Sequence, residues 1–272
     1  MIKSCVTISL VPSISSGPWI YWDNLEVSIP KAKKAGFDAV ELFTIGPDAV
    51  EPHMLNKLLE DNDIKLAAVG TGAGKVLHGL SLTNPDGEIR RKAREFVGGM
   101  IDFGAQFGAP AIIGSIQGSL HKQVEKQQSF GWLADSLDEL GQKAAAYNVK
   151  LIYEPLNRYE TDLINRLGDG VDFVKSLNNK NVALLADLFH MNIEEESITN
   201  TIYACKDYIG YVHLADSNRR PAGMGHIDMK EVGNTLNMIG YEGYLSAEAL
   251  PYPDTNQAAA QTMSIINEFI RL

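Results

Sequence analysis

Four side chains suited to metal binding and proton transfer end or interrupt apolar stretches in the second half of the chain. They lie in the segments KLIYE, LLADLFH, YVHLADS and LSAEAL, and are Glu154, Asp187, His213 and Glu248. If these residues converge, three carboxylates and one imidazole form a self-repelling cluster that a divalent cation would relieve. Oxygen ligands with one imidazole suit Mn²⁺, Co²⁺ or Mg²⁺, and Zn²⁺ is also compatible. The sequence therefore predicts one divalent metal ion per chain, with Mn²⁺ favoured, held by these four residues.

Each of the four residues also has a purely structural explanation. A carboxylate at a strand end more often caps the next helix or pairs with an arginine, and a histidine on a strand is usually a hydrogen-bonded core residue. The metal interpretation rests on the combination, because all four residues are expected at the ends of successive strands.

The same carboxylates could move protons. Inverting a stereocentre beside a carbonyl group, or moving the carbonyl group to the neighbouring carbon, requires removal of a carbon-bound proton. A metal ion bound to the carbonyl oxygen and a neighbouring hydroxyl oxygen stabilises the resulting enediolate. Epimerisation also needs a group on the opposite face to return a proton. Glu154 and Glu248 come from different strands and can approach a substrate from two sides. One is expected to act as base and the other as acid, with the roles reversed in the opposite direction.

Alternating strands and helices would position these residues. The apolar runs that predict strands are residues 2–10, 37–43, 65–69, 110–114, 151–153, 182–188, 209–215 and 244–250. The segments that predict helices by periodicity and capping residues are 24–35, 47–62, 87–107, 124–147, 169–177, 197–208, 228–239 and 255–270. Each predicted strand is therefore followed by a predicted helix.

This alternation predicts a closed (β/α)₈ TIM barrel, an α/β fold. Strands that alternate with helices imply a parallel sheet, and near-continuous apolar strands imply a sheet covered on both faces. A doubly wound open sheet is the alternative, but it would not need so many regular units. No linker or low-complexity segment divides the chain, so residues 1–272 are expected to form a single domain. In such a barrel the active site forms at the C-terminal ends of the strands.

The composition argues against several other classes of protein. The formal net charge of −10 argues against a nucleic-acid partner. No apolar segment approaches the ~20 residues that span a membrane, and the N-terminal segment lacks the pattern of a signal peptide. Cys5 and Cys205 are isolated thiols, expected to be buried rather than disulfide-bonded. The expected compartment is a reducing cytoplasm.

The spacing of the four candidate ligands resembles that of a known family. They are separated by 33, 26 and 35 residues, which is similar to the metal site of the xylose isomerase-like barrel superfamily. Within it the chain resembles ketose 3-epimerases of the D-tagatose 3-epimerase and D-psicose (allulose) 3-epimerase type. The resemblance covers essentially the whole chain and is strongest in EPLNRYETD, DLFHMN, VHLADSNRRPAGMGHID and YEGYLSAEAL.

The resemblance implies further roles. Glu160, His190 and Arg219 match the family positions that bind the oxygens of the substrate near its carbonyl end. The implied activity is inversion of C3 of a free ketose, with Glu154 and Glu248 as the two acid/bases. The implied partners are a small sugar and, as is typical of the family, further copies of the chain in a homodimer or homotetramer.

Other activities of the superfamily share this site. An aldose–ketose isomerase, a hydroxypyruvate isomerase, a dehydratase of keto-inositols and a lyase acting on 3-keto sugars remain alternatives. A non-catalytic sugar-binding role is a further alternative. An abasic-site endonuclease is a remote alternative from another class. It binds several zinc ions and needs more ligands on the early strands, but SLVPS, LFTIG, AVGTG and IGSIQ contain no histidine.

The first half of the chain contains two features of interest. GTGAGK, residues 70–75, departs from the phosphate-loop pattern and is expected to be a flexible loop, with a phosphate held by Lys75 as the alternative. Trp19, Tyr21 and Trp22 could wall a sugar pocket or pack against the barrel rim. The loop GSIQGSLHK lacks the aromatic expected for stacking on a sugar, so the identity of the substrate stays open.

Two features of the second half have simpler explanations. His226 and Asp228 could enter the site, but a turn followed by a helix capped by Asp228 explains them. Asn157 and Arg158 are expected to brace the loop behind Glu154.

Overall fold

The eight predicted strands close into a parallel barrel. The structure is a computed structural model that describes residues 1–14 and 16–271. The strands are β1 (Lys3–Ser9), β2 (Ala39–Phe43), β3 (Lys65–Gly70), β4 (Ala111–Ile113), β5 (Leu151–Tyr153), β6 (Val182–Asp187), β7 (Ile209–His213) and β8 (Tyr244–Ala247). Each pairs in parallel with its neighbours in sequence, and β8 pairs with β1. The predicted TIM barrel is therefore confirmed, and the open sheet is excluded.

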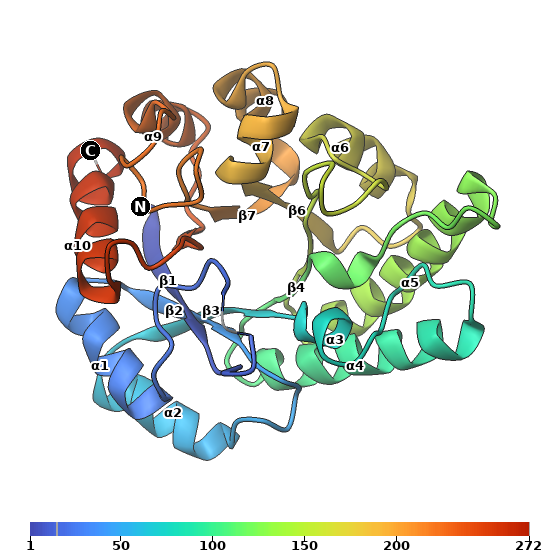
Figure 1. The fold of residues 1–272 in the computed structure, drawn as a ribbon, viewed down its shortest axis with the longest axis horizontal. Helices are drawn as coiled ribbons and strands as arrows, with labels where there is room; N and C mark the ends of the chain where they lie inside the picture. The colour runs from blue at the N-terminus through green and yellow to red at the C-terminus, as the bar shows by residue number, and fades with distance from the viewer. Residues whose placement is uncertain (15, 272) are drawn as a thin grey trace.

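Helices surround the strands (Figure 1). They are α1 (Leu25–Ala35), α2 (Pro52–Asp61), α3 (Ala73–Val76), α4 (Gly87–Ala105), α5 (Lys126–Ala146), α6 (Leu167–Ser176), α7 (Leu188–Glu194), α8 (Ile198–Cys205), α9 (Met229–Met238) and α10 (Thr255–Ile265). Short single-turn segments add η1 (Ser115–Gln117), η2 (Lys206–Tyr208) and η3 (Ile266–Ile270). Within the described residues, no helix has both the length and the hydropathy needed to cross a membrane.

Side chains at the helix starts explain where several helices begin. The side chains of Asp86, Ser197 and Asp228 accept hydrogen bonds from the first turns of α4, α8 and α9, and the cap at Asp228 was predicted. The segment expected as one helix over 47–62 begins only at Pro52, because the Glu51 side chain caps α2 there. Gly36 ends α1 with φ 99°, a backbone conformation that glycine adopts readily.

Several strands are shorter than their apolar runs. Leu214 and Ala215 are fully buried but follow the end of β7, and β8 ends at Ala247 rather than at residue 250. Burial continues into the loops above the barrel, so an apolar run alone overestimates strand length. The DLFHMN motif forms α7, which the periodicity did not predict because the helix has only 7 residues. The flexible loop expected at GTGAGK is only partly a loop, because α3 begins within it at Ala73.

The barrel interior below the C-terminal rim is packed. All eight strands contribute to one cluster, formed by Cys5, Ala39, Ala67, Ala68, Ile112, Ile152, Leu185 and Tyr211 with Ala183 and Tyr244 against it. The small side chains of β1 to β3 leave room for Tyr211. A much larger apolar layer lies between strands and helices. Cys5 and Cys205 are buried free thiols, as expected. The packed interior closes the barrel from below and leaves the C-terminal rim as the place for a site.

Candidate active site and metal centre

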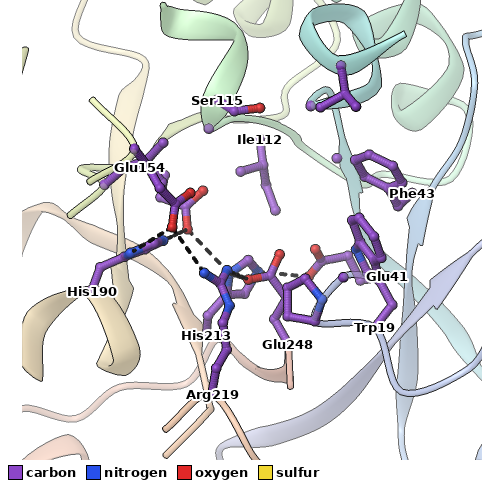
Figure 2. Close-up of a pocket in the computed structure, with 18 of the residues that line it drawn as sticks. Trp19, Glu41, Phe43, Ile112, Ser115, Glu154, His190, His213, Arg219 and Glu248 are labelled. Atoms are coloured by element: carbon purple, nitrogen blue, oxygen red, sulfur yellow. Dashed lines mark hydrogen bonds and ion pairs between the residues drawn. The ribbon is translucent and has the colours of Figure 1, made fainter. Parts of the chain in front are cut away.

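The four predicted ligands meet at the C-terminal rim. Glu154 and Glu248 directly follow β5 and β8, while Asp187 and His213 end β6 and β7. One ligand atom from each lies within 4.8 Å of the others. Nδ1 of His213 is 3.5 Å from Oε1 of Glu154, 3.6 Å from Oδ2 of Asp187 and 3.5 Å from Oε2 of Glu248. Figure 2 shows Glu154, His213 and Glu248 directed towards one another.

The unsatisfied atoms of this cluster fit a cation. Oε1 of Glu154, Oδ2 of Asp187 and Nδ1 of His213 are buried and have no hydrogen-bond partner. Leaving such atoms unpaired is costly. Ligands about 2.1 Å from a common ion are separated by about 3 to 3.5 Å, close to the separations found here. The residues therefore form a potential site for one divalent metal ion.

Asp187 has both the structural and the metal-binding features considered for it. Its Oδ1 accepts hydrogen bonds from the backbone N–H groups of Phe189 at 2.7 Å and His190 at 3.3 Å and so caps α7. Its Oδ2 faces the ligand cluster. One carboxylate thus starts a helix and points its second oxygen into the site, so the capping explanation and the ligand role are compatible.

The electrostatics of the cluster favour an added positive charge. Burial raises the pKa of Glu248 to about 8, with Glu154 and Asp187 contributing to the rise against the opposing effects of His213 and Arg219. Burial would lower the pKa of His213, but the surrounding carboxylates, Glu41 and Glu248 foremost, hold it well above its usual value. Protons compensate the carboxylates in the metal-free protein, and a divalent cation could replace them.

The three residues predicted to bind substrate adjoin the ligands. Arg219 donates from Nη2 to Oε2 of Glu248 at 2.8 Å and from Nη1 to Oε1 of Glu160 at 3.2 Å. Nε2 of His190 lies 3.9 Å from Oε1 of Glu154 and 3.6 Å from Oδ2 of Asp187. The structure thus brings all seven predicted residues into one group.

Asn157 fixes the tautomer of His190. Its side-chain amide donates to Nδ1 of His190 at 2.7 Å and to Oε1 of Glu160 at 2.9 Å, while its oxygen accepts from the N–H of Tyr159. The backbone N–H of Asn157 also donates to Nδ1 of His190. In the neutral ring the proton then resides on Nε2, which is buried without a partner. His190 therefore presents a hydrogen-bond donor to the cavity.

Arg219 is held by its own loop and by an aromatic ring. Its guanidinium lies 4.7 Å from the ring centre of Phe189, a cation–π geometry. Its backbone has φ 58°, an uncommon value for a residue other than glycine. Buried Asp216 stabilises this loop, because its two oxygens accept from the N–H groups of Ser217, Gly223 and Ile227.

Glu41 is a site residue that the sequence analysis missed. It lies in β2 and is 5% exposed. Its Oε2 accepts a hydrogen bond from the Tyr211 hydroxyl at 2.9 Å and lies 3.2 Å from Nε2 of His213. A charged residue within the apolar run FDAVELF was the signal that could have identified it.

A cavity of about 420 Å³ opens above the ligand cluster. Its far wall is apolar and comes mainly from the first half of the chain, as Figure 2 shows for Trp19 and Phe43 opposite His190. Val76, Ile112 and Leu156 complete this wall, and Ser115 adds a hydroxyl.

The aromatic residues of the first loop have different roles. Trp19 lines the cavity, the position expected of a residue that walls a pocket. Tyr21 is buried and bridges to Ile8 of β1, and the indole of Trp22 donates to the carbonyl of Trp19. Trp22 therefore supports Trp19, whereas Tyr21 packs against the barrel. Among the described residues that line the cavity, Arg219 is the only lysine or arginine, and Lys75 does not contribute.

The remaining predicted features have structural roles. Asp228 caps α9, and His226 contacts the hydroxyl of Ser217 away from the cavity. Arg158 donates to buried Glu194 on α7. Together with Asn157 it braces the loop behind Glu154, as expected.

Comparison with known proteins agrees with this fold. D-psicose 3-epimerase of Ruminiclostridium cellulolyticum is 32% identical over 244 residues, which cover 85% of this chain and 81% of that protein. L-ribulose 3-epimerase of Methylomonas sp. is 26% identical over 242 residues, covering 88% of this chain and 82% of the relative. The crystal structure of the D-psicose 3-epimerase of Clostridium cellulolyticum H10 with D-tagatose has a TM-score of 0.82 at 24% identity, covering all of both chains. Residues 29–269 match the family profile described as "Xylose isomerase-like TIM barrel". The chain therefore belongs to the xylose isomerase-like TIM barrel family, and its relatives include ketose 3-epimerases.

Proposed function

We propose that this protein is a divalent-metal-dependent epimerase that inverts C3 of a free ketose. One observation carries the proposal: carboxylate oxygens of Glu154 and Glu248, from β5 and β8, each lie 3.5 Å from the same nitrogen of His213. Two acid/base groups beside one ion are what inversion next to a carbonyl requires. The similarity to D-psicose, L-ribulose and other ketose 3-epimerases supports the choice of substrate class.

Each residue has a defined task in this proposal. Glu154, Asp187, His213 and Glu248 would hold the ion. When bound, the ion would polarise the carbonyl group of the sugar and stabilise the negative charge that develops on its oxygens. One of the two glutamates removes the C3 proton from one face, and the other returns a proton to the opposite face. The two exchange roles in the reverse reaction.

The neighbouring residues would orient the sugar. The Nε2–H of His190 is available to a substrate oxygen because Asn157 occupies Nδ1. Arg219 offers a planar fork of donors whose charge balances the two glutamates that it contacts. Glu160, held by Asn157, would accept a hydrogen bond from a hydroxyl group.

Two further features support a small sugar rather than DNA. The net charge of −10 provides little attraction for a phosphate backbone, and Arg219 is the only lysine or arginine among the described residues that line the cavity. We further propose Mn²⁺ as the ion, because the three carboxylates and one imidazole suit it. A homodimer or homotetramer is proposed by analogy with the family, and light scattering after size-exclusion chromatography tests it.

Isotope exchange tests the reaction. The protein, loaded with Mn²⁺, would be incubated with a panel of ketoses in D₂O and the products analysed by NMR. The expected result is a C3 epimer carrying deuterium at C3. Deuterium confined to C1 would instead indicate an aldose–ketose isomerase, and loss of water a dehydratase, and either result would refute 3-epimerisation. Protein treated with a chelator serves as the control.

A further inference from the structure

We propose that Glu41 is a positioning residue for the metal centre, which aims Nδ1 of His213 at the ion by accepting a hydrogen bond from Nε2–H of the same ring. The inference rests on the proposed metal-dependent function and adds a residue to it. Glu41 belongs to β2, whereas the four ligands come from the ends of β5 to β8.

The two nitrogens of His213 face different partners. Nε2 lies 3.2 Å from Oε2 of Glu41, and Nδ1 lies 3.5 to 3.6 Å from oxygens of Glu154, Asp187 and Glu248. An ionised carboxylate only accepts hydrogen bonds, so Nε2 must donate to Glu41. A neutral imidazole carries one proton, so Nδ1 then keeps its lone pair for a metal. A carboxylate on the second nitrogen of a metal-binding histidine fixes the tautomer and raises the basicity of the ligand.

Tyr211 holds Glu41 in this position. The Tyr211 hydroxyl donates to Oε2 of Glu41, the same oxygen that faces His213, at a distance of 2.9 Å. Tyr211 and His213 are two residues apart on β7 and therefore point to the same side of the strand, with ring centres 5.6 Å apart. Tyr211 is itself buried among the small side chains of the barrel interior. The Glu41 carboxylate is thus fixed by two donors from one strand.

A purely structural role for Glu41 makes a different prediction. If the carboxylate only satisfies the buried hydroxyl of Tyr211, removing it should lower stability without changing the affinity for metal. If it positions His213, the affinity should fall even where the metal-free fold is intact. Metal affinity therefore separates the two roles without any measurement of turnover.

The test is a titration of metal-free protein with Mn²⁺ by calorimetry, on wild type, Glu41→Gln, Glu41→Ala and Tyr211→Phe. The two Glu41 substitutions should raise the Kd by about 10- to 100-fold, the range found when such supporting carboxylates are lost. Tyr211→Phe keeps Glu41 and should raise the Kd by a smaller factor. The visible spectrum of the Co²⁺-loaded protein should also change in Glu41→Gln, because the basicity of the His213 ligand changes.

Asp38→Asn is the matched control. Asp38 directly precedes β2 and accepts hydrogen bonds from Ser4 and Arg271, at the end of the barrel opposite the metal site. Its substitution should leave the Kd for Mn²⁺ unchanged.

Two outcomes would count against the inference in different ways. A wild-type Kd in Glu41→Gln and Glu41→Ala, with only the melting temperature lowered, would overturn it and leave the proposed function standing. Absence of divalent metal binding by wild-type protein would overturn the proposed function and the inference together. If Glu41→Ala does not fold, Glu41→Gln and Tyr211→Phe decide between the two roles, with circular dichroism of the metal-free proteins as the check.

Discussion

Gly114 leaves the space that the carboxylate of Glu154 occupies. A Cβ atom built at Gly114 would lie 2.6 Å from Oε2 of Glu154, inside normal contact distance. The two residues follow the neighbouring strands β4 and β5, and the backbone N–H of Glu154 donates to the carbonyl of Ile113. Because these two strand ends approach closely, any side chain at position 114 would force the carboxylate of Glu154 to shift.

Gly114→Ala should therefore displace Glu154 and lower kcat by about 100-fold, the effect of a misplacement of about 1 Å in a catalytic group. Gly131→Ala is the matched control, because nothing lies within 4 Å of a Cβ at that helical position. It should leave kcat unchanged and stabilise the protein by about 0.5–1 kcal/mol. Kinetics and thermal unfolding of both variants check this, and equal activity of the two would contradict the role of Gly114.

Glu154→Gln and Glu248→Gln should each lower kcat by about 10² to 10⁴, because each substitution removes a group proposed to transfer a proton. Exchange of the C3 hydrogen with D₂O is the measurement. Glu95→Gln, on the exposed face of α4, is the control and should retain full activity. Wild-type exchange in either active-site variant would refute the assignment of two acid/bases.

Metal binding should release protons, so the affinity for Mn²⁺ should increase as the pH rises from 6 to 8. The pKa of Glu248 in the metal-free protein is raised to about 8, and that of His213 lies well above its usual value, so a cation must displace protons from both groups. Calorimetric titration with Mn²⁺ in buffers of different ionisation enthalpy measures this release. A Kd independent of pH over this range would contradict it.

The same shifts predict how the stability of the metal-free protein depends on pH. Glu248 ionises near pH 4.5 in the unfolded chain and near pH 8 in the folded chain, so the folded state holds the proton of this carboxyl group more tightly. The contribution of this proton to the free energy of unfolding is full below pH 4.5 and is lost as the pH rises through 8. The raised pKa of His213 acts in the same direction, whereas the lowered pKa of Asp187 matters only in acid. The melting temperature should fall between pH 5 and 8.5, less steeply in Glu248→Gln. A rise over this interval would contradict the expected sign.

Phe189→Leu should weaken substrate binding without affecting the metal. The substitution removes the ring that lies 4.7 Å from the guanidinium of Arg219. A cation–π contact is worth about 0.5–2 kcal/mol, which corresponds to a rise in KM of roughly 2- to 30-fold. Tyr203→Leu removes a comparable contact with Lys206 on the exposed surface of α8 and should not change KM. An altered Kd for Mn²⁺ in Phe189→Leu would indicate that the ring supports the metal ligands rather than the substrate-binding Arg219.

Free ketoses should be preferred over ketose phosphates by at least about 100-fold in kcat/KM. Among the described residues on the cavity wall, Arg219 is the only lysine or arginine, and it already contacts Glu160 and Glu248, so it has little charge left to compensate a phosphate. Competition between a ketose and its phosphate measures the preference. Lys75→Ala should leave it unchanged, and efficient turnover of the phosphate that depends on Lys75 would restore the alternative considered for GTGAGK.

The sequence by itself determined the barrel and the polar residues on its rim. Both signals are local: an apolar run that ends in a polar side chain marks a strand end, and a parallel barrel collects such ends on one side. Glu154, Asp187, His213 and Glu248 could therefore be assigned to one site without coordinates. The short helix α7 escaped prediction because its 7 residues carry too little periodicity.

Only the tertiary structure decided which residues support that site. Glu41 and His213 are 172 positions apart and meet across the interior of the barrel, so no local pattern links them. The fit of Glu154 against Gly114 and the left-handed backbone of Arg219 likewise depend on packing between separate loops. The physical reason is that a strand pattern determines which face a side chain takes, whereas its partner across the barrel is determined only when β8 pairs with β1.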